Sequence, residues 1–199
     1  MSPVGSVFDM GFAPIYCYNH ICMKRSVAIW EIMGFIFVVL LGTALHFAFT
    51  ASGDSLALAP FVPVNESVWE HLKLLFYPFL LFAAIEFRFV GKGIKNFWFA
   101  KGMVSLLGPL AIIAMFYSYV GLIGDNFLPA DIGVFVIAAA LSSRLGYNIM
   151  THHLIPKRSR AVAIGIITLM VAGFIAFTFL PPENELFIDP LTGEYGIPR

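Results

Sequence analysis

Four ionisable side chains that could do chemistry fall within eight residues of one another. They are Glu66, Glu70, His71 and Lys73, in the run NESVWEHLK at residues 65–73, directly before a long apolar segment. Two nearby carboxyl groups whose pKa values are pushed apart can work as a general acid and a general base, and a lysine can neutralise one of them. These four residues are therefore the catalytic candidates.

A histidine further up the chain extends the cluster to a candidate metal site. His46 lies about one turn from the outer end of the preceding apolar segment, at a depth similar to that of Glu70 if the two segments are antiparallel neighbours. Imidazole and carboxylate groups bind divalent metals, and an ion with an open position activates water. We expect His46, Glu66, Glu70 and His71 as metal ligands, with acid-base catalysis without a metal as the alternative.

The spacing also makes a geometric prediction and admits a purely structural interpretation. At about 100° per residue, Glu66, Glu70 and Lys73 share one stripe of a helix, and His71 points away from Glu70. Glu66 and Glu70 would then share a proton or a cation. In the structural interpretation, Ser67-x-x-Glu70 is a capping box. The Ser67 hydroxyl accepts a hydrogen bond from the Glu70 amide, and the Glu70 carboxylate accepts one from the Ser67 amide.

The segments that must position these side chains are apolar helices. Hydrophobic residues make up 59% of the 199 residues and charged residues 12%, and several apolar runs exceed the roughly 20 residues that cross about 30 Å of hydrocarbon. Barrel strands would be shorter and would alternate in polarity. The sequence predicts an all-α integral membrane bundle of five transmembrane helices, near residues 27–50, 68–90, 102–122, 132–150 and 161–180.

Charged residues in the connections alternate in sign along the chain. Basic residues precede the first segment and follow the second and fourth, whereas acidic residues follow the first, third and fifth. Because Lys and Arg in short loops stay on the cytoplasmic side, we predict a cytoplasmic amino terminus and an external carboxyl terminus in the cell membrane. With a formal net charge of zero, the partner implied is the lipid bilayer and not a nucleic acid.

This topology divides the chain into three parts. Residues 1–26 form a cytoplasmic segment, in which Met23 is an alternative start to Met1, and residues 27–180 form the transmembrane domain. Residues 181–199, rich in proline and acids, are expected to be an exposed external tail.

A second polar layer is expected near the cytoplasmic ends of the helices. It consists of Glu31, Glu86, Arg144 and Asn148. Arg144 interrupts an apolar span, and a buried guanidinium needs a carboxylate partner. We expect Arg144 to pair with Glu86 or Glu31 as a structural tie.

One run of the chain resembles a known family. The run PVNESVWEHLK, after Leu45-His46-Phe47 and before Tyr77-Pro78, is similar to small multi-pass bacterial and archaeal membrane proteins of unknown function with an N-E-S-x-W-E-H run. The likeness covers about residues 30–180. It implies the helical membrane architecture and brings no activity with it.

Three functions fit these features. The first is a membrane-embedded hydrolase, acting on a lipid-like or small amphipathic substrate in an external Glu/His pocket, with Glu70 as base or metal ligand. The second is a small ion-coupled transporter, and the third is an accessory subunit of a membrane complex. The oligomeric state is left open.

Overall fold

The computed structural model describes residues 20–151 and 159–198, and this part of the chain is helical. Its elements are α1 (His20–His46), α2 (Ala48–Ala51), α3 (Val68–Phe89), the short 3-10 helix η1 (Gly91–Gly93), α4 (Phe97–Ile123), α5 (Leu128–Thr151) and α6 (Ser159–Phe179). Within the same residues, β pairing is limited to one isolated bridge between Ile188 and Tyr195. The prediction of an all-α fold is confirmed.

The amino-terminal boundary differs from the prediction. α1 begins at His20, so residues 20–26, which the sequence assigns to a separate segment, belong to the first long helix. The rest of that predicted segment, residues 1–19, lies outside the described residues.

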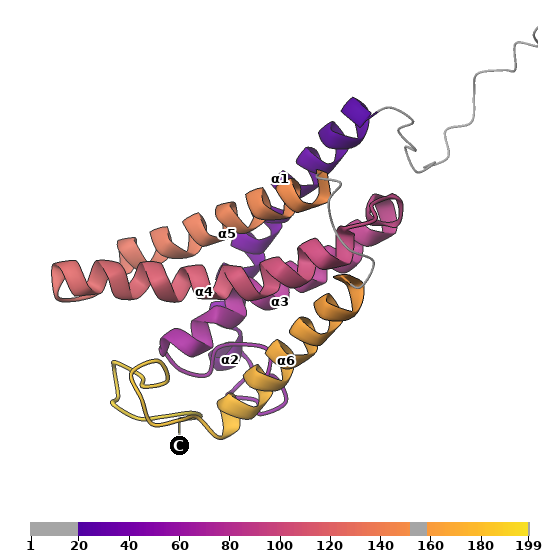
Figure 1. Cartoon of the computed structure of the whole chain (residues 1–199). Coiled ribbons are helices and arrows are strands. Elements are labelled where there is room, and N and C mark those ends of the chain that lie inside the picture. The colour runs from indigo at the N-terminus through magenta and orange to yellow at the C-terminus, as the bar shows by residue number, and fades with distance from the viewer. Residues whose placement is uncertain (1–19, 152–158, 199) are drawn as a thin grey trace, which may run out of the picture.

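Helix α3 lies in the middle of the bundle. It contacts α1, α4 and α6, while α5 packs against α1 and α4. Only residues 124–127 connect α4 to α5, and so short a link forces the two helices to pack antiparallel. The long helices run in alternate directions, so the end of α1, the start of α3, the end of α4 and the start of α5 gather at one end (Figure 1).

The core forms around α3 because this helix buries apolar side chains on several faces. Leu72, Leu75, Phe76 and Phe79 are at most 4% exposed. They pack against side chains from every other long helix in the described chain, namely Val38, Val104, Ile112, Ala138, Ala139 and Phe174. Burying each large apolar side chain contributes about 1.5–3 kcal/mol, so this apolar layer fixes the position of α3.

Four of the described helices are long and apolar enough to cross a membrane: Cys22–His46, Phe97–Ile123, Leu128–Thr151 and Arg160–Phe179. Only 17–28% of their most apolar stretches is buried inside the protein, and Leu40, Leu122 and Leu169 are 68%, 89% and 73% exposed. Apolar faces of this extent need a lipid environment or a protein partner. The sequence predicts five spans; α3, with its buried ionisable groups, is not among these four.

Helices α4 and α6 approach each other closely at a glycine. A Cβ atom on Gly102 would lie 2.6 Å from the Cα atom of Ala163. A larger residue at position 102 would therefore force the two backbones apart. Small residues at such positions let helix backbones approach closely in membrane proteins.

The two ends of the bundle differ in charge. Basic residues lie at the start of α1, the end of α3, the connection to α4 and the start of α6: Lys24, Arg25, Arg88, Lys92, Lys95 and Arg160. Acidic residues lie at the opposite end and in the tail that follows α6: Glu66, Glu70, Asp125, Asp131, Glu183, Glu185, Asp189 and Glu194. The sign alternation in the sequence thus corresponds to two distinct ends.

Candidate metal and catalytic site

An ion pair between Glu70 and Lys73 is buried at the acidic end of the bundle. The Lys73 Nζ atom lies 2.5 Å from Glu70 Oε2, and the two residues are 0% and 2% exposed. One turn of α3 separates them, so both side chains project from the same face of the helix. Buried charges need hydrogen-bond partners for all their polar atoms. Neighbouring backbone and side-chain groups must therefore be placed to bind this pair.

Lys73 and Glu70 hold the loop at residues 52–67 against α3. Lys73 Nζ donates to the carbonyl oxygens of Ala59 and Val62 at 2.9 and 3.2 Å. Glu70 Oε2 accepts from the Val64 amide at 3.0 Å. The loop that precedes α3 is therefore folded back along its first turns, and its backbone satisfies the buried charges.

Thr178 joins α6 to the same ion pair. Its hydroxyl accepts from Lys73 Nζ at 2.6 Å and lies 3.1 Å from Glu70 Oε1, and Thr178 is fully buried. Three parts of the chain, α3, α6 and the 52–67 loop, thus meet at Glu70 and Lys73. The sequence predicts that Lys73 neutralises one of the two glutamates, and in the structure that glutamate is Glu70.

Half of the predicted capping box is present. The Ser67 hydroxyl accepts from the Glu70 amide at 3.4 Å, so Ser67 is the N-cap of α3. The Glu70 carboxylate does not reach back, because it is held by Lys73; instead Asn65 Oδ1 accepts from the Ser67 amide at 2.9 Å. Glu66 therefore precedes the helix, and the prediction that it shares a helical stripe and a proton with Glu70 is wrong.

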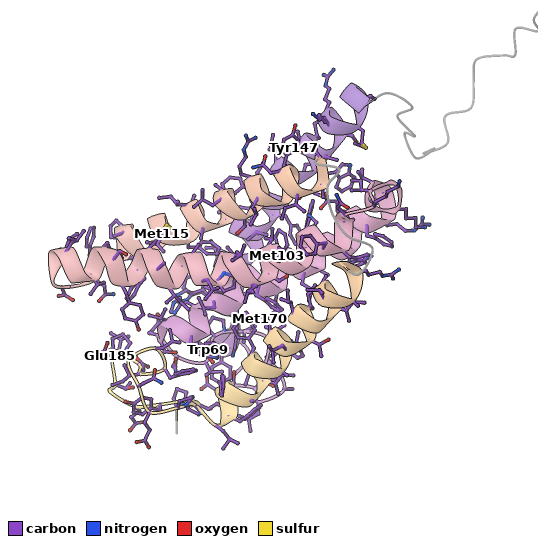
Figure 2. The ribbon with its side chains drawn as sticks, viewed as in Figure 1. Trp69, Met103, Met115, Tyr147, Met170 and Glu185 are labelled. Carbon is purple, nitrogen blue, oxygen red and sulfur yellow. The ribbon has the colours of Figure 1, made fainter. Side chains whose placement is uncertain are left out.

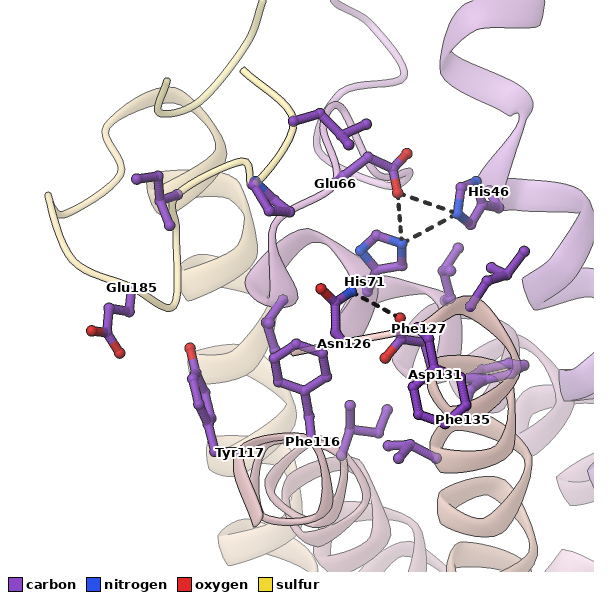
Figure 3. A pocket seen from close by; sticks show the side chains of 18 residues that line it. His46, Glu66, His71, Phe116, Tyr117, Asn126, Phe127, Asp131, Phe135 and Glu185 are labelled. Carbon is purple, nitrogen blue, oxygen red and sulfur yellow. Dashed lines mark hydrogen bonds and ion pairs between the residues drawn. The ribbon is translucent and has the colours of Figure 1, made fainter. Parts of the chain in front are cut away.

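Glu66, His71 and His46 come together in a separate cluster. The Nε2 atoms of the two histidines are 3.2 Å apart. Glu66 Oε2 lies 3.3 Å from His71 Nε2 and 3.7 Å from His46 Nε2. Figure 3 shows these three atoms pointing at one another, from the end of α1, the loop and the first turn of α3.

The backbone fixes the orientation of the His71 ring. His71 Nδ1 lies 2.9 Å from the Ser67 carbonyl oxygen, which can only accept, so Nδ1 carries the proton. In the neutral imidazole Nε2 then has a free lone pair, and it faces Glu66 and His46. A hydrogen bond of this kind on the far nitrogen is the usual support of a metal-binding histidine.

The spacing of the three donor atoms fits a metal ion. A point equidistant from atoms 3.2, 3.3 and 3.7 Å apart lies about 2.0 Å from each, which matches zinc bonds to nitrogen and oxygen of about 2.0–2.2 Å. Tetrahedral ligands at such bond lengths are about 3.3 Å apart. Among the described residues, His46, Glu66 and His71 are the group of three that could hold an ion; Glu70, predicted as a fourth ligand, is held elsewhere by Lys73.

Glu66 remains ionised under ordinary conditions. When the His71 ring is also protonated at Nε2, the hydrogen bond that this nitrogen donates is the main cause that lowers the pKa of the Glu66 carboxyl; the charges of the protonated imidazoles add to it, while burial opposes them. In the neutral imidazole that would bind a metal, this hydrogen bond is absent. A lowered pKa in the folded state stabilises the fold above the unfolded pKa, and this contribution is lost as the pH falls through the folded value. At neutral pH Glu66 is therefore an available carboxylate ligand.

A cavity of about 380 Å³ opens beside the three donor atoms. Most of its wall is apolar and comes from α3, α4, the 124–127 connection, α5 and the tail: Val68, Leu74, Ile112, Phe116, Phe127, Leu128, Val134, Phe135, Ile188, Pro190 and Leu191. Its other acids are Asp131 and Glu185, and the described residues that line it include no lysine or arginine. The site is an apolar pocket with a polar, acidic rim.

Asp131 is a pocket residue that sequence reasoning missed. It lies in the first turn of α5, accepts from the Tyr119 hydroxyl and binds Asn126 Nδ2 at 3.1 Å. In Figure 3 its carboxylate lies on the same side of the pocket as His71. An acid in a first helical turn is usually explained by the helix dipole, so the sequence signal was ambiguous; only the packing of α5 against α4 places it here.

The carboxyl-terminal tail lies over this end; most of its described residues are exposed, as predicted, but Phe187 and Asp189 are buried. The Trp69 amide donates to the Leu186 carbonyl at 3.0 Å, and Asn65 Nδ2 donates to the Gly196 carbonyl at 2.7 Å. The Trp69 ring contacts Phe187, which is 6% exposed. Trp69 and Glu185 lie at the same end of the bundle (Figure 2). The tail therefore forms one wall of the pocket.

At the other end of the bundle, the predicted pairing of Arg144 is wrong. Lys101, not Arg144, lies between Glu31 and Glu86, at 2.7 and 2.6 Å. Arg144 is exposed, with its guanidinium over the Tyr147 ring. The predicted third span begins at residue 102, because Lys101 is charged and was assigned to the loop before it. In the structure α4 begins at Phe97, so Lys101 lies within the helix.

The remaining member of the predicted polar layer is Asn148. It is half-buried on α5, and its carbonyl oxygen lies 3.4 Å from the Thr151 hydroxyl. Glu31 and Glu86 are buried, and they share Lys101 as their cation.

Fold and site together define a helical bundle whose helices suit a membrane, with a cluster of two histidines and one glutamate at the mouth of an apolar pocket. The model of a family described as a family of unknown function, DUF6512, matches residues 20–197, and the chain belongs to this family. No curated protein and no solved structure matches the chain. The function must therefore be argued from the site.

We predict that Lys73→Met destabilises the protein by about 3–5 kcal/mol, because it leaves Glu70 as an uncompensated buried charge. The double variant Glu70→Gln/Lys73→Met should recover more than half of this loss, since it removes both charges. The measurement is thermal unfolding in detergent followed by circular dichroism. Lys92→Met, at an exposed position, is the control for the same chemical change. A double variant no more stable than Lys73→Met would contradict the role of the pair.

Proposed function

We propose that the protein is a membrane-embedded, metal-dependent hydrolase, with a divalent ion, zinc in the first instance, held by His46, Glu66 and His71. The observation that carries the proposal is the triangle of donor atoms with edges of 3.2, 3.3 and 3.7 Å. Two imidazoles and one carboxylate leave a zinc ion an open position, which is the arrangement of catalytic sites. The adjoining pocket provides room for a substrate at that position.

The proposed topology has five membrane-crossing helices. α3 has 22 residues, or about 33 Å at 1.5 Å per residue. It packs against α1, α4 and α6, and its charged residues Glu70, Lys73 and Glu86 are buried. With the basic end of the bundle in the cytoplasm, the pocket and the carboxyl terminus face the exterior of the cell membrane. An ionisable cluster at this depth would then lie near the outer lipid headgroups.

The chemistry divides between the ion and the pocket residues. A metal ion at the site would polarise a carbonyl group and lower the pKa of a water molecule. Asp131 is the carboxylate placed to accept a proton from water in the pocket and to return it to the leaving group. The hydrogen bonds from Tyr119 and Asn126 orient the Asp131 side chain. Glu70, predicted as the base, acts instead by holding the loop that carries Glu66.

The lining favours an amphipathic substrate without negative charge. Eleven apolar side chains can bury an acyl chain or a similar group. The ionisable groups on the wall are acids, histidines and Tyr117, with no lysine or arginine among the described lining residues. Because an anionic headgroup would meet Glu66, Asp131 and Glu185, we infer a neutral or cationic head and an ester or amide bond near the metal site.

A transporter would need a polar path between the two ends of the bundle. Between them lies the apolar layer of Leu72, Leu75, Phe76 and Phe79, each at most 4% exposed. An accessory subunit would not need His46 to turn toward a pocket, yet His46 contacts His71 and Glu66 there. The hydrolase proposal accounts for both observations.

The metal proposal predicts about one zinc ion per chain in protein purified without a histidine tag. His46→Ala and His71→Ala should each lower the zinc content at least tenfold, because two protein ligands hold the ion poorly. Glu185→Gln, which removes a pocket acid outside the triangle, should keep it. Plasma mass spectrometry of zinc, iron and manganese measures the outcome. Zinc content unchanged in both histidine variants would remove His46 and His71 as ligands.

The hydrolase proposal predicts cleavage of neutral and cationic acyl esters or amides by zinc-loaded protein in nanodiscs. An anionic substrate with the same acyl chain should be cleaved at least tenfold more slowly. Asp131→Asn should lower kcat about 100-fold or more, as expected for loss of a general base, while zinc content stays unchanged.

Hydrolysis is followed by mass spectrometry of the released fatty acid, with Glu185→Gln as the matched acid-to-amide control. No cleavage anywhere in the panel by zinc-loaded wild type would count against hydrolysis. Faster cleavage of the anionic member would contradict the charge argument alone.

A further inference from the structure

Lys101 and two glutamates form a buried cluster inside the bundle, toward the opposite end from the proposed metal ligands. Lys101 Nζ lies 2.7 Å from Glu31 Oε1 on α1 and 2.6 Å from Glu86 Oε2 on α3. The three residues are 1%, 4% and 0% exposed. The rings of Phe79 and Phe97 cover the ammonium group at 5.0 and 5.2 Å. Water is therefore largely excluded from these charges.

The charges of the cluster do not balance when every group is ionised. Two carboxylates face one ammonium, which leaves a net charge of −1. From α5, the charged or titratable groups facing the cluster are Arg144 and Tyr147, and the Arg144 guanidinium lies over the Tyr147 ring, without an ion pair to either glutamate in the described chain. Lys101 and Glu86 are the charged groups that act on Glu31.

A net charge buried in a low-dielectric interior is strongly unfavourable, and such a site takes up a proton instead. We propose that the cluster holds one exchangeable proton at neutral pH, shared between the Glu31 and Glu86 carboxyl groups. Lys101 stays charged, so the protonated cluster is neutral. Both oxygens of Glu86 are buried, and Glu86 Oε1 has no hydrogen-bond partner among the described residues, which gives the proton an acceptor.

The proton can exchange with the surroundings through Glu31. A cavity of about 410 Å³ reaches the Glu31 side chain and is open to the outside. Its polar lining also includes Ser143 and Arg144.

Helix α5 makes room for the Glu31 carboxyl group at a glycine. A Cβ atom on Gly146 would lie 2.8 Å from Glu31 Oε1. Glu31 thus fits into a recess against the α5 backbone while it binds Lys101 on α4. A change in protonation here would alter how α1, α3, α4 and α5 are held together, whatever reaction the other end of the bundle performs.

Infrared difference spectroscopy of the full chain in nanodiscs tests the proposal. Wild type at neutral pH should show the carbonyl stretching band of a protonated carboxyl group, shifted in heavy water. Glu31→Gln and Glu86→Gln should each abolish the band, because one carboxylate then balances one ammonium. Lys101→Met should increase it about twofold, since both acids must then be neutral.

Glu66→Gln and Asp131→Asn serve as controls, and both should keep the band. Circular dichroism verifies that each variant is folded, and the glutamine variants preserve side-chain shape if Lys101→Met does not fold. Absence of the band in wild type, or its persistence in both glutamine variants, would overturn the proposal. A band that appears only in sodium-free buffer would also overturn it, and would assign the site to sodium.

Discussion

The buried ion pair of Glu70 and Lys73 is the constraint on which the acidic end of the molecule depends. Neither charge reaches water, so each must find its partners within the protein. Lys73 finds them in backbone carbonyls of the 52–67 loop and in Thr178 of α6. A pair of this kind adds little net stability compared with apolar residues of the same size. We infer that its contribution is to specify one position for the loop.

That position determines where Glu66 lies. Only two residues, Asn65 and Glu66, lie between Val64, whose amide binds Glu70, and Ser67, which caps α3, so the chain between them has little freedom. Glu66 is held facing the first turn of α3, where His71 follows Glu70 directly. The end of α1 supplies His46 because α1 packs antiparallel against α3 (Figure 1). One buried ion pair thus supports a cluster to which it contributes no atom.

The bundle has polar groups at two levels with an apolar layer between them. One level, at the acidic end, consists of the histidine and glutamate cluster and the pocket; the other, toward the basic end, is Lys101 with its two glutamates. α3 carries residues of both levels, Glu70 and His71 near its start and Glu86 near its end. The close-packed apolar layer between them keeps the proposed metal site apart from the Lys101 cluster.

Much of this arrangement could be predicted from the sequence, and the rest could not for physical reasons. Apolar runs and alternating charges predicted the helices and their opposite ends. The ionisable residues of the NESVWEHLK run were also predicted as site residues, but which of them contact one another was predicted only from helical spacing. Spacing fails for Glu66 because Asn65 and Ser67 end the loop in a turn before the helix begins. The buried pairing of Lys101 could not be predicted, because its partners Glu31 and Glu86 lie on two other helices that only the packing of the bundle brings beside α4.

X-ray absorption at the zinc edge of tag-free, zinc-loaded protein is a direct test of the metal site formed by His46, Glu66 and His71. Such a site should show only nitrogen and oxygen neighbours of zinc at about 2.0–2.2 Å, with the outer-shell scattering of two imidazole rings. That scattering should fall to one ring in His71→Ala. Sulfur neighbours at about 2.3 Å, or a spectrum without imidazole scattering, would contradict a metal site formed by His46, Glu66 and His71.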